Sequence, residues 1–269
     1  MSTDGFDARS IRAVHGALTV TLVAAVGVRI SVSGLVRVEG ADLSDSAGAL
    51  FTVAALAVLV FRFFRVVRWH NLAIVAMHAG RHDDARRTFE QIARGFHGRT
   101  IASTAVHNLA ELAMRRGAFE EAVKLARARL AFSPDKGPMH DLAEQQLAFS
   151  LACAGSTDES LEHARACEHE EASVEVRAGA ALTRALAAFR AGRYADAQST
   201  LSSSRTLLRT TLTGWAAALA VAMEAGVLER LDGAYRAGAT APSGLPYSAS
   251  TRKLVASVLP GSEAWLGSR

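Results

Sequence analysis

One short sequence pattern recurs down the C-terminal two-thirds of this chain, and its nearly constant period limits the fold more than any other feature. Three clear copies, a looser fourth and a reduced fifth occupy residues 71–89, 108–126, 146–164, 183–201 and 215–226. Each copy contains a glycine, and successive glycines are 37, 38, 37 and 34 residues apart. A period in this range predicts stacked pairs of helices, and proteins built this way usually bind other proteins.

The composition agrees with an all-helical chain. Half of the residues are apolar, only 6% are aromatic, and alanine is abundant, which suits closely packed helices better than a β-rich core. The net charge of +4 is a small excess over mixed charges, so it does not indicate a nucleic-acid-binding surface. The two cysteines, Cys153 and Cys167, are too few for a disulfide framework and fit a reducing compartment.

Two apolar stretches, residues 14–36 and 47–61, precede the repeats. Together with the short polar turn between them they predict a transmembrane hairpin over residues 1–68, although each stretch is short or interrupted by charge. A signal peptide would explain only the first stretch. Two buried core helices of a soluble domain are the other alternative.

The arginines that flank these stretches predict the orientation. Positive charge stays on the cytoplasmic side, so both ends of the hairpin are expected in the cytoplasm, which makes this a two-pass protein of the cell inner membrane with a cytoplasmic repeat domain. Neither glycine nor proline occurs between Leu50 and Ala79, so the second membrane helix is expected to continue without a break into the first repeat helix. The residues expected at the membrane interface are Arg62, Phe63, Phe64, Arg65, Arg68 and Trp69.

The second copy shows the repeat pattern best. It combines small and apolar residues in a first helix, a glycine at the turn, and an aromatic residue and an alanine in a second helix. These positions are Leu109, Ala110, Ala113, Gly117, Phe119, Ala122 and Pro134. In this pattern the chain resembles the tetratricopeptide repeat (TPR) family. The resemblance implies an α-solenoid of about five helical hairpins over residues 69–235, followed by a loop and a C-terminal capping helix over residues 236–269. The layout of two helices before the repeats is also similar to that of HemY-like membrane proteins, in architecture only.

The resemblance also implies a concave groove along the first helices of the repeats, where a protein or peptide partner would bind. The groove is expected to be polar near the membrane and apolar toward the C-terminus, although its apolar members could equally pack between repeats. Two asparagines in it occupy positions from which their amides can hold an extended peptide backbone. The expected lining is His70, Asn71, Ile74, Met77, His107, Asn108, Glu111, Met114, Gln145, Phe149, Leu182, Leu186 and Phe189.

No motif for catalysis or cofactor binding occurs in the sequence, so we expect neither an enzyme nor a cofactor. His163, Cys167 and His169 form one short cluster of metal-ligand types. It lacks the paired spacing of a closed zinc site, so no metal is assigned to it.

Two functions remain open on the sequence alone. The first is a non-enzymatic, membrane-anchored scaffold that recruits a partner through the groove. The second is a structural subunit of a transport, secretion or biogenesis complex in which the hairpin itself is the interface. Small residues at Gly27, Ser31 and Gly34 would permit close helix packing in the bilayer for that second role.

Overall fold

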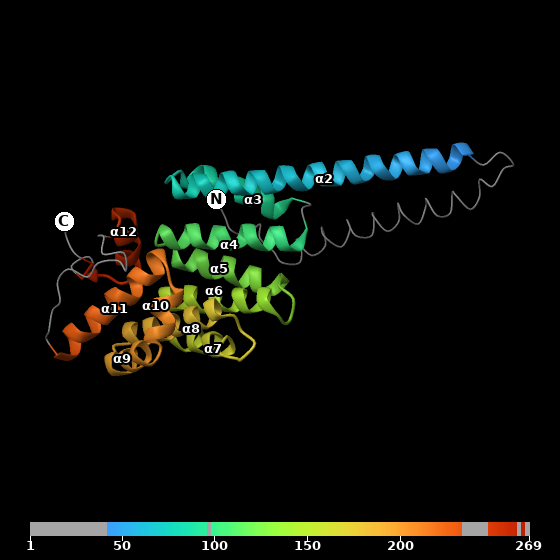
Figure 1. The fold of residues 1–269 in the computed structure, drawn as a ribbon. Coiled ribbons are helices and arrows are strands. Elements are labelled where there is room, and N and C mark those ends of the chain that lie inside the picture. Colours follow the sequence, from blue (N-terminus) through green and yellow to red (C-terminus); the bar gives the residue numbers. More distant parts are fainter. Residues whose placement is uncertain (1–41, 96–97, 233–246, 263–264, 267–269) are drawn as a thin grey trace. The chain divides into compact units, whose positions relative to one another are not determined.

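The computed structural model describes residues 42–95, 98–232, 247–262 and 265–266, and every regular element in these ranges is a helix (Figure 1). The chain divides into two compact units, 1–108 and 109–269. The helices are α2 (Asp42–His78), α3 (His82–Arg94), α4 (Arg99–Arg115), α5 (Phe119–Phe132), α6 (Pro138–Ala154), α7 (Thr157–Ala166), α8 (Val174–Arg190), α9 (Tyr194–Ser203), α10 (Arg205–Thr211), α11 (Gly214–Asp232) and α12 (Ala249–Val258). The all-α prediction is therefore confirmed for the described residues.

Helix α2 is a single uninterrupted helix of 37 residues, and Figure 1 shows its full length. It contains the second apolar stretch and the first repeat helix, so the prediction of an unbroken connection is confirmed. The predicted domain boundary after residue 68 falls inside this helix. Among the described residues, no helix combines the length and the apolar character needed to cross a membrane. The first apolar stretch, residues 14–36, lies outside the described residues.

Four of the repeat glycines form turns with nearly the same backbone geometry. Gly80, Gly117, Gly155 and Gly192 have φ angles of 76°, 73°, 91° and 73°. This left-handed conformation strongly favours glycine, because a Cβ atom would be strained there. After each glycine, the next backbone N–H donates to the carbonyl five residues earlier, at 2.9 Å in all four turns. This bond is the signature of a Schellman cap, which ends one helix and directs the chain into the next.

The residue five positions after each of these glycines is small and fully buried. These residues are Ala85, Ala122, Ser160 and Ala197, and each has an exposed fraction of 0%. A small side chain lets the second helix of a hairpin approach its neighbours closely. The repeated sequence pattern thus encodes two things at each copy, the turn and the close contact that follows it.

In the second unit, helices α6 and α8 each pack on several others. Helix α6 contacts α5, α7 and α8, and α8 in turn contacts α9, α10 and α11, as the adjacent ribbons in Figure 1 illustrate. Contact between α6 and α8 joins the first helices of two successive copies. Gly179 in α8 permits this approach, since a Cβ atom there would lie 2.5 Å from the side-chain nitrogen of Gln145.

The sequence pattern predicts a glycine turn in the fifth copy, at Gly226. The structure has no turn there. Helix α11 continues through Gly226 to Asp232, and the Trp265 ring and Phe189 occupy the space beside Gly226. A Cβ atom on Gly226 would lie 2.7 Å from that ring, so this glycine serves packing and not a turn. The predicted capping helix is present as α12, which packs on α11.

Candidate functional site

Residues expected at the polar end of the groove, His70 among them, lie in the first unit. The His70 ring packs edge-to-face on Phe89, with ring centres 5.4 Å apart. Its Nε2 atom lies 3.4 Å from the amide nitrogen of Asn108, while its Nδ1 atom is buried and has no hydrogen-bond partner in the structure. Burial lowers the pKa of His70, which favours the neutral ring. Because Asn108 is itself buried, these two residues support the surface more than they form it.

Other expected groove residues of the first unit differ in how accessible they are. Asn71 is exposed, Ile74 and His107 are half-buried, and Met77 is buried. Asn71 and Ile74 lie one turn apart on α2, so both are on the same side of the helix. These two are the members of the predicted set that a partner of the first unit could reach most directly.

Beside Asn71, the first repeat leaves an apolar edge uncovered. Leu72 is 55% exposed and Val75 is 58% exposed, whereas Leu109, Leu147 and Leu112 at matching positions of later copies are at most 4% exposed. In a helical-repeat protein, residues at such positions are normally covered by the neighbouring repeat. The described residues place nothing over this edge of the first copy.

In the second unit, the expected apolar lining of the groove is largely buried. Phe149, Leu182, Leu186 and Phe189 are at most 8% exposed. The Phe149 ring packs on Trp215, with ring centres 5.3 Å apart. Their burial favours the alternative left open by the sequence, in which these residues pack between helices, because helical spacing also places residues at such contacts.

The remaining expected residues of the second unit are engaged locally. Glu111 accepts a charged hydrogen bond from Arg115 one turn later on α4, at 2.5 Å. Met114 is buried, and Gln145 packs on Gly179. Glu111 and Gln145 are half-buried and so remain accessible to a partner in part.

Histidines and carboxylates gather where α6 and α7 meet, an arrangement that the sequence pattern did not reveal. Glu144 lies between two histidines, with its Oε2 atom 2.5 Å from Nδ1 of His163 and its Oε1 atom 3.5 Å from Nε2 of His140. Asp141, one turn earlier, lies 3.4 Å from Nε2 of His169. The one feature of the sequence that could have indicated this arrangement is the four-residue spacing of His140 and Glu144, which places both on one helix face.

Cys167, the central member of the cluster noted in the sequence, does not face these histidines. Its thiol lies 3.4 Å from the carbonyl oxygen of His163 and 3.7 Å from that of Asp141. Burial raises the pKa of both Cys153 and Cys167 to about 12, so both remain protonated at neutral pH. No three His, Cys, Asp or Glu side chains in the described part of the chain are arranged to hold a metal ion.

The contact between His163 and Glu144 makes a pH-dependent contribution to stability. The hydrogen bond to Glu144 raises the pKa of His163 above its ordinary value of 6.5, with further support from Glu159 and Glu162. The protonated ring therefore stabilises the fold fully below about pH 6.5, and this contribution is lost as the pH rises through the folded-state pKa. We expect the difference in free energy of unfolding between the wild type and His163→Gln to be larger at about pH 6 than at about pH 8.5. Urea titrations at both pH values measure it, and a pH-independent difference would contradict the assignment.

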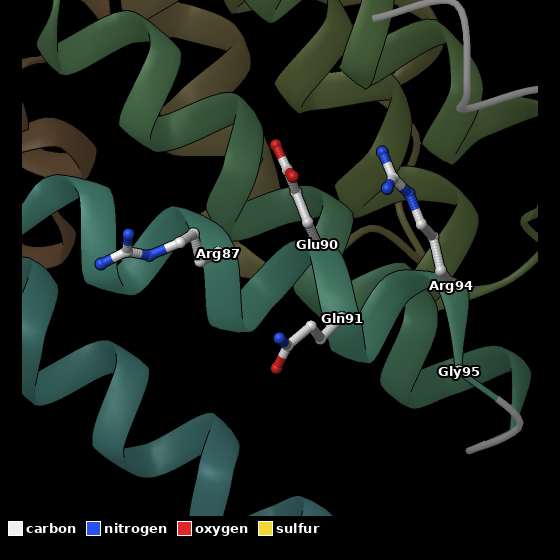
Figure 2. Close-up of a pocket in the computed structure, with 5 residues that line it drawn as sticks. All are labelled: Arg87, Glu90, Gln91, Arg94 and Gly95. Carbon is white, nitrogen blue, oxygen red and sulfur yellow. The ribbon is translucent and has the colours of Figure 1, made fainter. Parts of the chain in front are cut away.

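A hollow of about 400 Å³ lies along α3, lined by Arg87, Glu90, Gln91, Arg94 and Gly95. Figure 2 shows that Glu90 and Arg94 extend from one side of α3 while Gln91 extends from the other, so the side chains do not converge. Arg87 pairs with Asp84 at 2.6 Å, and Glu90 pairs with Arg86 at 2.9 Å. Arg87 and Glu90 are thus paired within the helix.

Of the residues expected at the membrane interface, Arg62, Phe63, Phe64, Arg65 and Arg68 are exposed on α2, and Trp69 is half-buried. Every described side chain from Ala54 to Arg65 is exposed, and burial begins only at Val66. The guanidinium carbon of Arg65 stacks over the Trp69 ring at 4.5 Å from its centre. Large apolar residues are exposed in this segment, namely Leu56, Val58, Val60, Phe61, Phe63 and Phe64.

No protein-family model matches this chain, and no curated protein or solved structure is similar enough to count as a match.

Proposed function

We propose that this chain is a non-enzymatic, TPR-like helical-repeat scaffold that is attached to a membrane and recruits a protein or peptide partner. The observation that carries the proposal is the turn repeated at Gly80, Gly117, Gly155 and Gly192, with one backbone geometry and one hydrogen bond at every copy. Arrays of similar helical hairpins form extended surfaces, and such surfaces are typical of protein recognition. On this proposal the hairpins stack as an α-solenoid.

Attachment to the membrane is proposed from the α2 segment 54–65, whose described side chains are all exposed. Large apolar side chains surround most of the helix between Leu56 and Phe64. A helix that is apolar on all sides is stable in a protein core or in lipid, and the described residues provide no core around this segment. The two-pass topology of residues 1–68, with the repeats in the cytoplasm, remains our proposal for how the chain is held.

The recruiting surface is proposed to lie on α2 around Asn71. Asn71 is exposed there and offers an amide that can pair with a peptide backbone. The uncovered residues Leu72 and Val75 follow it and offer apolar contact area. An exposed amide next to exposed apolar residues fits a protein segment better than a small polar ligand.

The test is affinity purification of the full chain from native membranes, comparing the wild type with Asn71→Glu and Asn71→Trp. Because Asn71 is exposed, both variants are expected to keep the wild-type thermal unfolding curve and to lose at least about tenfold of the specific partner, as for a residue at an interface centre. The matched control is Gln91→Glu, which changes an exposed amide on the second helix of the same hairpin. Partner recovery that is unaffected by Asn71 variants yet reduced by Gln91→Glu would refute this recruiting surface.

A further inference from the structure

The C-terminal end of the exposed α2 segment carries a one-sided group of arginines. Arg62, Arg65 and Arg68 recur every three residues, so they fall within an arc of about 120° around the helix. All three are exposed. The spacing therefore places three cations on one side of α2, directly after its apolar part.

The acidic residues that normally balance such a group are missing from the surrounding sequence. No aspartate or glutamate occurs from residue 46 to residue 82, a stretch of 37 residues. The nearest carboxylate on their own helix, Asp45, is 17 residues before Arg62, which is about 25 Å along the helix and well beyond the screening length of about 8–10 Å, so it does not cancel the positive potential of the three arginines. Helix α3 packs on α2 in the first hairpin. Val66 is the first buried residue among the described side chains of α2.

Aromatic residues stand in the same short segment. Phe63 and Phe64 are exposed, and Trp69 lies under the Arg65 guanidinium at 4.5 Å. Tryptophan and arginine side chains together suit the boundary between acyl chains and head groups, where the ring is half-immersed and the cation reaches the phosphate level. The stacking also limits the rotamers of Arg65, so less freedom is lost when it binds an anion.

We propose that Arg62, Arg65 and Arg68 form a binding surface for the phosphate groups of anionic phospholipids at the bilayer surface. The inference rests on the proposed attachment of α2 to a membrane and adds the lipid class that holds it. An apolar segment that surrounds most of the helix fits a bilayer, which contacts it from every side, better than a protein groove, which would contact one face. The adjacent one-sided cations are complementary to a negatively charged leaflet.

The test uses the full chain, purified in mild detergent and added to two kinds of vesicle. One kind contains phosphatidylcholine alone, and the other contains phosphatidylcholine mixed with phosphatidylglycerol. Flotation then measures the partition coefficient of the protein for each. The wild type is expected to favour the anionic vesicles by about 10- to 100-fold at low salt, and this preference is expected to shrink as salt is added.

Three variants separate the charge effect from the attachment itself. Arg62→Gln/Arg65→Gln/Arg68→Gln is expected to lose the preference and to keep its binding to neutral vesicles. A control with the same change in charge at exposed arginines elsewhere, Arg165→Gln/Arg177→Gln/Arg193→Gln, is expected to retain the wild-type preference. Phe61→Ser/Phe63→Ser/Phe64→Ser is expected to weaken binding to both kinds of vesicle.

The possible outcomes distinguish the anionic-lipid surface from the membrane attachment on which it rests. Equal wild-type binding to both vesicles, or equal loss of preference in the control variant, would overturn the anionic-lipid surface and leave the attachment intact. Failure of the wild type to bind either vesicle would overturn the proposed attachment itself. In that case concentration-dependent self-association, measured by analytical ultracentrifugation, would identify a second copy of the chain as the occupant of the exposed α2 segment.

Discussion

Replacing Trp265 by alanine is expected to lower the free energy of unfolding by about 3–5 kcal/mol, the usual loss for a large buried aromatic residue. Trp265 is 5% exposed, and its ring fills the space beside Gly226 on α11. Its indole N–H donates to a carboxylate oxygen of Glu229 at 2.5 Å. The variant removes this contact between the C-terminal segment and α11, and urea unfolding followed by circular dichroism measures the loss.

A second substitution, Gly226→Ala, tests whether the Trp265 ring occupies the space beside Gly226. Alanine is normally a better helix residue than glycine by about 1 kcal/mol. In the wild type, Gly226→Ala is nevertheless expected to be destabilising, because its new Cβ atom would collide with the Trp265 ring. In the Trp265→Ala background the collision is gone, and Gly226→Ala is expected to be stabilising. The same sign in both backgrounds would show that the ring does not occupy this space.

Ala122→Leu is expected to lower the free energy of unfolding by about 1–3 kcal/mol, the cost of forcing extra methylene groups into a packed core. Ala122 is fully buried on α5, five residues after Gly117. The equivalent residues Ala85, Ser160 and Ala197 are also small and fully buried. The lack of room for a larger side chain at this position is therefore a property of the repeat. Chemical denaturation measures the loss.

The matched control is Lys124→Leu, which introduces the same side chain on the same helix at an exposed position. It is expected to change the free energy of unfolding by no more than about 0.5 kcal/mol, as is usual for surface substitutions. An Ala122→Leu variant as stable as this control would show that α5 does not pack as closely as the repeat pattern implies.

The turns could be predicted from the sequence because their cause is local. A left-handed residue at a helix end requires glycine, and the small residue five positions later follows from the close contact of two helices. Gly80, Gly117, Gly155 and Gly192 are each followed five residues later by such a small residue, so the sequence around them predicts their conformation. The unbroken course of α2 was predictable for the same reason, since nothing in its sequence interrupts a helix.

Gly226 and the apolar groove residues could not be predicted in this way, because their surroundings come from distant parts of the chain. A glycine that ends a helix and a glycine that accommodates a ring look alike in sequence, and Trp265 lies far along the chain from Gly226. Phe149 and Leu186 recur at helical spacing whether they face a partner or another helix. Their burial depends on α11 and on neighbouring copies.

The contact of Glu144 with His140 and His163 shows an intermediate case. The first pair lies one turn apart on α6 and is readable from spacing. His163 belongs to α7, and only the packing of α7 on α6 brings it within hydrogen-bonding distance of the same carboxylate. Sequence reasoning instead grouped His163 with Cys167, whose thiol is directed to backbone carbonyl oxygens.

Site-specific photo-crosslinking in native membranes tests the central claim most directly, namely that this is a membrane-attached repeat scaffold with a protein partner on α2. A photoreactive amino acid is placed at Asn71 or, as the control, at Gln91 on the other helix of the same hairpin. The account predicts that the chain fractionates with membranes and that a discrete protein adduct forms from position 71 and not from position 91. Recovery of the chain in the soluble fraction, or adducts from position 91 alone, would contradict it.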